Sequence, residues 1–298
     1  MKYRFRRKIL YILLLLLHKI ILLLPLRLAI AVGKFSGFLA YLFLPRYPRI
    51  TKENLRKAFN NEKSIQQINK IAVNVFCNLG MSIAEVLSMP KIKRQLDKRI
   101  YGVGFEKLDN ALSKGKGVII ISAHLGNWEL LPLYYAAKDY PANVMARRIY
   151  YEKYDEWVKV LRENTGANII FRDESPRKVL EVLKNNETLG IMPDQDIDSV
   201  DGVFVNFFNR PAYTPSAPVA LAIKMGCPIL PCFIIRENGR HKIVVEDPVD
   251  LVITDNKQED IIKNTQTWSA IVESYIRRYP EQWVWMHRRW KTKPRDSV

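Results

Sequence analysis

His124 and Glu129 lie five positions apart in the segment HLGNWE, directly after a short apolar run. The unperturbed pKa of histidine, about 6.5, lets the imidazole accept a proton from an alcohol near neutral pH. Residues five apart do not face each other on one helix. We therefore expect His124 in a turn and Glu129 in the first turn of the next helix, bonded to the distal ring nitrogen. This pair suits general-base catalysis, but the spacing fits equally well a structural histidine at a strand end, followed by a carboxylate that the helix dipole favours.

Further polar residues follow the other predicted strands of the chain. In an open α/β sheet, functional groups collect beyond the carboxyl ends of the strands. Asn127 is also placed to cap the helix after His124, and the free N–H groups of that helix would help to hold a developing oxyanion. We assign to substrate binding the polar side chains at these strand ends: Asn127, Arg147, Arg148, Asp194, Gln195 and Asp196.

The elements that would position these residues alternate between strands and helices. Short apolar runs predict buried strands at 117–123, 143–146, 168–171 and 189–192, with helices between them at 128–137, 154–165 and 176–185. After residue 216, a helix and a strand precede the hairpin signal Asn238-Gly239, which predicts an antiparallel pair at one edge. Further helices are expected at 62–90 and 258–278. The predicted fold class is α/β, with a mixed, largely parallel sheet flanked by helices.

The start of the chain predicts a membrane anchor. Basic residues at 2–8 precede an apolar run from Ile9 to Leu24, which spans about 24 Å as a helix against about 30 Å of hydrocarbon. With a second apolar stretch at 35–44, a helix lying in one leaflet and a spanning helix are equally open. A cleaved signal peptide fits less well, because Pro25 and Arg27 separate the apolar run from the small-residue pattern that would be cut. We expect an N-terminal membrane helix within an anchor at 1–45, and a catalytic domain at 46–298.

Composition limits the function classes. Hydrophobic residues make up 48% of the chain and charged residues 26%, which excludes extended disorder. The net charge of +17 favours a polyanionic partner, either nucleic acid or anionic lipid. Three cysteines without a C-x-x-C pair indicate neither a disulfide framework nor a zinc site. There is no phosphate-binding loop and no H-E-x-x-H motif, and the imperfect nucleophile elbow GMSIA falls in a predicted helix, where Ser82 would serve packing or surface.

Two aromatic segments have competing interpretations. The run GVFVNFF predicts a buried strand rather than a wall of an acyl-chain groove. Near the C-terminus, the segment PEQWVWMHRRW places three tryptophans close to His287, Arg288 and Arg289. We interpret them as an interfacial belt with headgroup-binding cations rather than a nucleic-acid patch, because nucleic-acid binding would not need an apolar N-terminus. His287 in this segment is a weak catalytic candidate.

Several segments together resemble a known family. The H-x4-E spacing after a buried strand resembles the H-x4-D/E signature of glycerolipid-type acyltransferases. The wider pattern is similar to the late acyltransferases of lipid A biosynthesis, the lauroyl/myristoyl transferase family. The match is carried, in order along the chain, by LPLRLAIAVGKFSGFLAYLFLPRYPRITKENLRKAF, HLGNWE, ARR with LRENTGANII, PDQD with GVFVNFFNRPAYTPSAPVALAIKMGCPILPCF, and PEQWVWMHRRW.

The resemblance implies a glycerolipid-acyltransferase-like fold and transfer of an acyl chain from acyl carrier protein, or from coenzyme A, to a hydroxyl of an acylated diglucosamine lipid. It places the enzyme at the inner membrane, with the catalytic domain facing the cytoplasm. His124 would be the base and Glu129 its partner, Arg147 would support substrate binding or the charged intermediate, and Asp194 would line the same pocket. One departure is RRIYYEKYD, where the family often has an Asn-Pro pair after the arginine, so which of Arg147 and Arg148 takes the family's arginine role stays open.

The implied reaction needs neither a cofactor nor a metal, and it proceeds by direct attack of the lipid hydroxyl on the thioester, without an acyl-cysteine. We expect a monomer that meets anionic lipid and no nucleic acid. Two alternatives stay open: an acyltransferase for a glycerophospholipid or a phosphatidylinositol mannoside, and a basic membrane-tethered scaffold or nucleic-acid-binding protein without turnover.

Overall fold

The structure of the protein, a computed structural model, describes residues 2–174 and 176–294, with side chains from Leu10 onward. The predicted basic side chains at 2–8 therefore lie outside the described part.

Seven strands in this part of the chain form one mixed sheet, in the order β1-β9-β8-β2-β5-β3-β4. The neighbours β8, β2, β5, β3 and β4 run parallel, β9 is antiparallel to β8, and β1 is parallel to β9. The strands are β1 (Ile100–Val103), β2 (Val118–Ile121), β3 (Ala142–Ala146), β4 (Asn168–Phe171), β5 (Thr188–Ile191), β8 (Ile229–Glu237) and β9 (Arg240–Val245). The predicted mixed, largely parallel sheet is confirmed, and β1 is a strand that the sequence pattern did not indicate. The run GVFVNFF forms β6 (Gly202–Phe207), which pairs with β7 (Arg210–Pro215) in a separate antiparallel hairpin.

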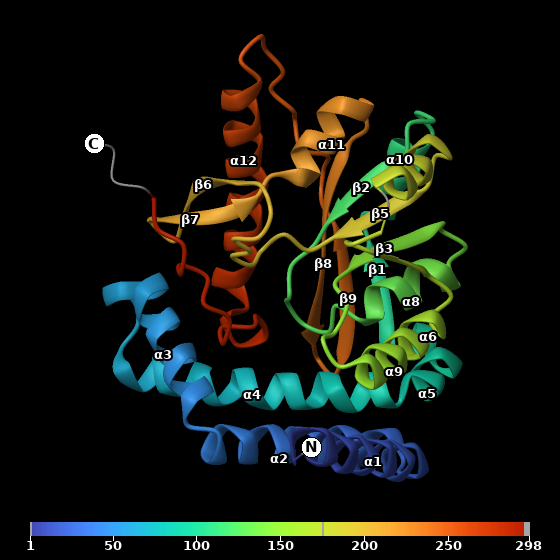
Figure 1. Cartoon of the computed structure of the whole chain (residues 1–298), viewed down its shortest axis with the longest axis vertical. Coiled ribbons are helices and arrows are strands. Elements are labelled where there is room, and N and C mark those ends of the chain that lie inside the picture. The colour runs from blue at the N-terminus through green and yellow to red at the C-terminus, as the bar shows by residue number, and fades with distance from the viewer. Residues whose placement is uncertain (1, 175, 295–298) are drawn as a thin grey trace.

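The helices include the predicted ones, close to their predicted ranges, and others at 46–59, 89–94, 96–99 and 105–112 that the sequence pattern did not indicate. They are α1 (Lys2–Leu23), α2 (Leu26–Phe43), α3 (Arg46–Phe59), α4 (Ile65–Leu87), α5 (Met89–Arg94), α6 (Leu96–Arg99), α7 (Phe105–Leu112), α8 (Leu130–Ala137), α9 (Glu152–Glu163), α10 (Pro176–Lys184), α11 (Ala217–Met225) and α12 (Lys257–Arg278), with short 3₁₀ turns at Asn60–Glu62 and Pro280–Gln282. Figure 1 shows the sheet between its covering helices, α4 running across the lower ends of the strands, and α1 and α2 forming a further layer beneath α4.

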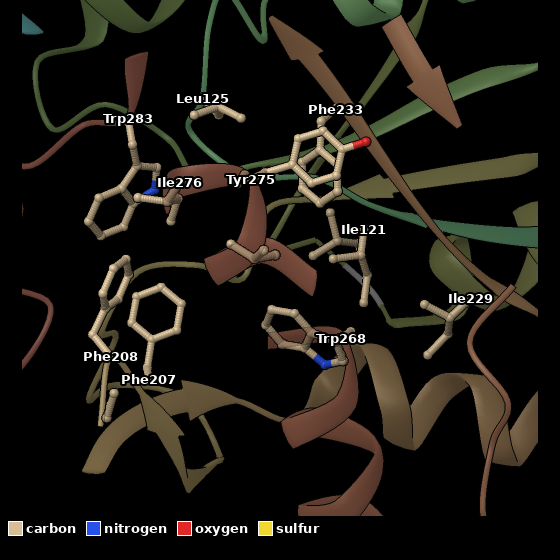
Figure 2. Packing of buried hydrophobic residues seen from close by; sticks show 14 of the residues in the cluster. Ile121, Leu125, Phe207, Phe208, Ile229, Phe233, Trp268, Tyr275, Ile276 and Trp283 are labelled. Atoms are coloured by element: carbon tan, nitrogen blue, oxygen red, sulfur yellow. The ribbon is translucent and has the colours of Figure 1, made fainter. Parts of the chain in front are cut away.

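Two hydrophobic clusters fill the two faces of the sheet. Along β2, Ile119 and Ile121 belong to one cluster and Val118 and Ile120 to the other, as expected for a strand buried on both faces. The first cluster packs under α10, α11 and α12, and Figure 2 shows its aromatic part around Phe233 and Tyr275. The second packs under α7 and α8. The strand ends are thereby held rigidly between helices, which is what a catalytic site at these ends requires.

Helix α2 packs on α4 through glycines. A Cβ at Gly33 would overlap the carbonyl oxygen of Gly80, and a Cβ at Gly37 would overlap that of Phe76. The two helix backbones can approach this closely only because these positions have no side chain. The predicted boundary at residue 45 falls between α2 and α3 and stays a prediction.

Two described helices are long and apolar enough to cross a membrane by length and composition, Leu26–Phe43 and Ile65–Leu87. In the second of these, α4, 50% of the apolar window is buried inside the protein, against 22% in α2. Helix α4 contributes Ile68, Ala72 and Val75 to the main cluster, so it is a core helix of the protein. The shorter apolar stretch Leu10–Leu23 lies in α1.

The interpretation of the C-terminal tryptophans as an interfacial belt is wrong. Trp283, Trp285 and Trp290 are 1%, 0% and 7% exposed, and Arg289 is 1% exposed. They pack on Phe207 and Phe208 in the main cluster, as Figure 2 shows for Trp283. This aromatic and basic segment is therefore part of the core, and the Arg289 guanidinium donates to the Tyr213 carbonyl and the Thr214 hydroxyl.

Candidate active site

The turn after β2 brings His124 to Asp194. Ile121 and Ile191 are register partners on the neighbouring strands β2 and β5, and His124 and Asp194 each follow three residues later. His124 Nδ1 lies 2.7 Å from Asp194 Oδ1, and the His124 backbone N–H donates to Asp194 Oδ2 at 2.9 Å. The Trp283 indole N–H donates to the same Oδ2 at 2.8 Å. A buried carboxylate with three donors thus fixes the ring and leaves Nε2 for a substrate.

The expected hydrogen bond between His124 and Glu129 does not form. Glu129 is the residue before α8, and its carboxylate receives two hydrogen bonds from Arg162 on α9, at 2.9 Å from Nε and 2.6 Å from Nη2. The carboxylate prefers the bidentate guanidinium because two parallel charge-assisted bonds outweigh one bond to an imidazole. Asp194, assigned to substrate binding, is the residue that orients His124.

Charge and burial act in opposite directions on this pair. Burial lowers the pKa of His124, but the attraction of Asp194 and the hydrogen bond to it outweigh burial and raise the pKa above its usual value, with a smaller contribution from Glu129. Burial raises the pKa of Asp194, but the attraction and hydrogen bonds of His124 and the Trp283 bond bring it down to about 2. Asp194 is therefore ionised at neutral pH and stabilises the imidazolium that proton transfer would create.

Gly126 lets the turn pass close to β8. Its φ of 62° lies in the left-handed region, and a Cβ there would overlap the carbonyl oxygen of Ile234. The Gly126 N–H donates to the Gln282 carbonyl at 3.0 Å. In the opposite direction, the Val284 N–H donates to the His124 carbonyl at 3.1 Å. The segment after α12 thus forms one wall of the turn.

Asn127 does not cap α8, contrary to expectation. Its side-chain amide donates to Glu85 Oε2 at 2.8 Å and to the Ser82 carbonyl at 3.3 Å, both on α4. Asn127 is only 1% exposed. It is a structural residue, because an amide buried this far cannot reach a substrate.

Glu85 gathers cationic and polar groups behind the turn. Its carboxylate accepts from Arg236 at 2.5 and 2.9 Å and lies 2.9 Å from His241 Nε2. Burial raises the pKa of Glu85, but His241 and Arg236 together hold it far below its usual range. Ser82 is 5% exposed and its hydroxyl lies 3.4 Å from the Gly126 carbonyl, so it serves packing. The network joins α4, β8 and β9 to the turn that carries His124.

Arg147 and Arg148 are both exposed after β3. The Arg148 guanidinium lies 3.9 Å from the ring centroid of Phe171 and 3.1 Å from Asp173, with Asp155 and Glu174 both at 3.5 Å. Arg147 forms no ion pair with any residue in the described ranges. Of the two, Arg147 is the cation left available to a ligand.

Gln195 and Asp196 also differ in whether the side chain is engaged by other residues of the protein. Asp196 is 1% exposed and accepts from the Thr292 N–H at 2.9 Å and from its hydroxyl at 2.7 Å, so it fastens the C-terminal segment. Gln195 is half-buried beside Asp194. The predicted substrate contact of Asp196 is therefore replaced by a structural role, whereas Gln195 keeps its side chain in reach of solvent.

A mostly apolar pocket opens under α8 next to the turn. It is lined by side chains of β2, β3, β5 and α8, among them Leu131, Tyr135, Val144 and Met192, and by Trp128. The Trp128 ring meets the His124 ring edge-on, with 5.1 Å between centroids. A hydrocarbon chain in this pocket would lie beside the imidazole.

Two residues of the site were missed in the sequence. Arg162 and Trp283 both lie in segments that carried the resemblance, but neither follows a predicted strand, which was the criterion used. Only the tertiary structure reveals them, because each reaches the site from a helix or loop that is distant in sequence. His287 lies near enough to feel the charges of Asp194 and His124, and burial lowers its pKa to about 4.

The three cysteines are free and buried. Burial raises the pKa of each thiol, to about 11 for Cys227 and about 12 for Cys232. A thiol with a raised pKa is a poor nucleophile at neutral pH. Among the residues that the structure describes, no three metal-ligating side chains come together.

Comparison with known proteins agrees with this geometry. Residues 1–292 match the family described as bacterial lipid A biosynthesis acyltransferase. The chain belongs to this family. It is 24% identical to the lipid A biosynthesis palmitoleoyltransferase of Escherichia coli over 278 residues, 88% of this chain and 84% of that protein. The lipid A biosynthesis lauroyltransferase of the same organism is also 24% identical, over 266 residues, 87% of this chain and 83% of that protein.

A relative with another printed activity matches as well. The phosphatidylinositol mannoside acyltransferase of Mycobacterium tuberculosis is 27% identical over 215 residues, 69% of this chain. The match spans 66% of that relative, slightly less than two thirds of its length. The printed names of the relatives therefore refer to more than one acceptor lipid, so membership of the family does not by itself identify the acceptor.

Proposed function

We propose that the protein is an O-acyltransferase that moves a fatty acyl chain from a thioester donor to a hydroxyl of a lipid A precursor. The observation that carries the proposal is the His124–Asp194 pair beside an apolar pocket, in a chain of the lipid A acyltransferase family. The donor is acyl carrier protein or acyl-coenzyme A, and a net charge of +17 favours docking of an acidic carrier protein.

His124 acts as the general base. With Nδ1 engaged by Asp194, Nε2 takes the proton from the acceptor hydroxyl as its oxygen attacks the thioester carbonyl. The attack forms the new C–O bond, and collapse of the tetrahedral intermediate re-forms the carbonyl and breaks the C–S bond. The proton passes from His124 to the leaving thiolate. No acyl-enzyme is needed, which agrees with three buried thiols of raised pKa.

The oxyanion of the intermediate needs hydrogen-bond donors. The backbone N–H groups of Trp128 and Glu129, at the start of α8, donate to no acceptor in the described ranges. Donors at a helix start are suited to a developing negative charge. The Arg162 guanidinium lies beside this helix start, where it is paired with Glu129.

The enzyme works at the inner membrane with its catalytic domain in the cytoplasm. Outward-facing side chains of α1 and α2 are apolar and exposed, including Leu16, Leu23 and Phe43 at 51%, 85% and 75%. Because α2 is packed tightly on α4, which belongs to the domain core, helices lying along one leaflet fit better than helices crossing the bilayer.

A phosphatidylinositol mannoside or glycerophospholipid acceptor is the second candidate. The likeness to the mycobacterial enzyme favours it. Both candidate functions use the His124–Asp194 pair and differ only in the acceptor lipid.

Mass spectrometry of membrane lipids tests the proposal. Cells that express the wild-type chain should contain a diglucosamine lipid heavier by one acyl chain than the lipid in cells that express His124→Ala. The His124→Ala enzyme should be slower by on the order of 10²- to 10⁴-fold. The same mass gain on a mannoside or glycerophospholipid would select the second candidate. Equal lipid profiles for folded wild-type and variant proteins would contradict the site assignment.

A further inference from the structure

Helix α9 joins the active site to the N-terminal helix α1. Its C-terminal turn carries Arg162, whose guanidinium holds Glu129 at 2.6 and 2.9 Å. Another face of α9 carries Tyr154, Trp157 and Leu161 at spacings of three and four, the spacing of one helix face. Leu161 is the only residue of α9 that is buried, so α9 has little packing of its own against the sheet.

The partner of this apolar face is α1. The Trp157 ring meets the His18 ring edge-on, with 5.7 Å between centroids, and the Tyr154 ring lies 5.9 Å from that of Tyr11. Leu161 packs with Ile21 in a small cluster that also contains Trp157. The cluster is separate from the two that fill the sheet and also contains Ala29 of α2 and Leu87 of α4, so α1 is one of the elements that α9 packs on away from the sheet.

The two faces of α1 differ in their surroundings. Tyr11 and His18 face α9. Ile21 is 3% exposed and packs with residues of α2, α4 and α9. Leu13, Leu16, Ile20 and Leu23 on the other side are between 51% and 85% exposed. One side of α1 is therefore available to lipid, while the other supports the helix that carries Arg162.

We propose that α1 is part of the catalytic apparatus as well as a membrane anchor: through Trp157 it holds α9 so that Arg162 stays paired with Glu129. Trp157 is then a positioning residue, and a bilayer that holds α1 in place also holds Arg162. The inference rests on the acyltransferase function proposed above. A displacement of about 1 Å at a site of this kind can cost as much as 10²-fold in rate.

Kinetics of purified full-length protein in detergent micelles test the inference. Trp157→Ala, and His18→Ala from the side of α1, should each lower kcat about 10-fold with little change in KM for the acyl donor, and Trp157→Phe should restore most of the rate. Val160→Ala is the matched control, because Val160 is 49% exposed on the same helix and should leave kcat unchanged. Unchanged kcat in both Trp157→Ala and His18→Ala would overturn the inference.

A double-mutant cycle with Arg162→Lys separates positioning from general damage. If Trp157 acts through Arg162, Trp157→Ala should cost much less in the Arg162→Lys background than in the wild type. The same fold loss in both backgrounds would show that Trp157 acts elsewhere.

Hydrogen exchange gives a readout that does not depend on turnover. Amides of α9 should exchange about 10-fold faster in Trp157→Ala and His18→Ala than in the wild type, while those of α12 should not change. Unaltered α9 exchange would contradict the inference even if no acyl transfer were found, whereas an inactive wild type with loosened α9 in the variants would contradict only the proposed function.

Discussion

At the scale of single residues, the acid–base behaviour of the site depends on which carboxylate reaches His124. Asp194 does so from β5, at 2.7 Å, while Glu129 is engaged by Arg162. The two carboxylates therefore have different tasks: Asp194 orients the base, and Glu129 holds a cation beside it. In this chain the H-x4-E spacing places His124 in a turn and Glu129 at the start of a helix, and the two side chains are not hydrogen-bonded to each other.

The pH profile of Asp194→Asn tests this assignment. Loss of Asp194 removes the main attraction that raises the pKa of His124 and leaves the burial that lowers it. Since the neutral imidazole is the active form, activity rises as pH increases through this pKa, and the acidic limb of kcat/KM should move to lower pH while kcat falls. Asp196→Asn is the control, because Asp196 bonds to Thr292 and should leave the position of the limb unchanged. A limb that stays in place in Asp194→Asn would contradict the pairing.

At the scale of elements, the site depends on how closely the turn after β2 passes its neighbours. Gly126 packs against the backbone of β8, and the segment after α12 supplies Gln282 and Val284 to the turn. Glu85 on α4 holds the next residue, Asn127. The geometry of the turn thus depends on three elements that are far apart in sequence.

Gly126→Ala should damage both stability and turnover. The new Cβ would overlap the Ile234 carbonyl, in addition to the cost of a positive φ, so the free energy of unfolding should fall by at least about 2 kcal/mol. Gly115→Ala is the matched control: its φ is 68°, but a Cβ there would meet nothing within 4 Å, so only the conformational cost of about 1 kcal/mol applies. Chemical denaturation and acyl-transfer assays of the two variants measure the difference, and equal losses would refute the close-packing argument.

At the scale of the whole molecule, apolar surface is concentrated on one side. Exposed leucines, isoleucines and phenylalanines line α1 and α2, which form the lowest layer in Figure 1. A contiguous apolar surface of this kind indicates an interface with lipid or protein. The chain has a net charge of +17, and residues 1–45 contain eight lysines and arginines and no acidic residue, which favours anionic lipid at this side.

Vesicle binding tests this orientation. Leu16→Glu should lower co-sedimentation with vesicles that contain phosphatidylglycerol about 10-fold or more, because a buried leucine contributes roughly 1.5–3 kcal/mol. Ile253→Glu is the control: Ile253 is 61% exposed, in the segment before α12 at the end of the molecule away from α1 (Figure 1). Equal binding of both variants would mean that α1 does not meet the bilayer.

The sequence by itself determined the alternation of strands and helices, since apolar runs such as 118–121 are short and made of β-branched residues, which favours buried strands over helices. It also indicated His124 as the base and Asp194 as a member of the site, because both follow strands that end at one edge. The hairpin after β8 was equally visible in Asn238-Gly239.

Only the tertiary structure decided the partners. Asp194 meets His124 because β2 and β5 are neighbours in register, and Arg162 takes Glu129 because α9 lies over that edge. The C-terminal tryptophans became core for the same reason: a cationic neighbour such as Arg289 can be buried when backbone oxygens receive it. Local pattern fixes which residues belong to an element, but strand order and helix placement set the distances between side chains, and proton transfer depends on those distances.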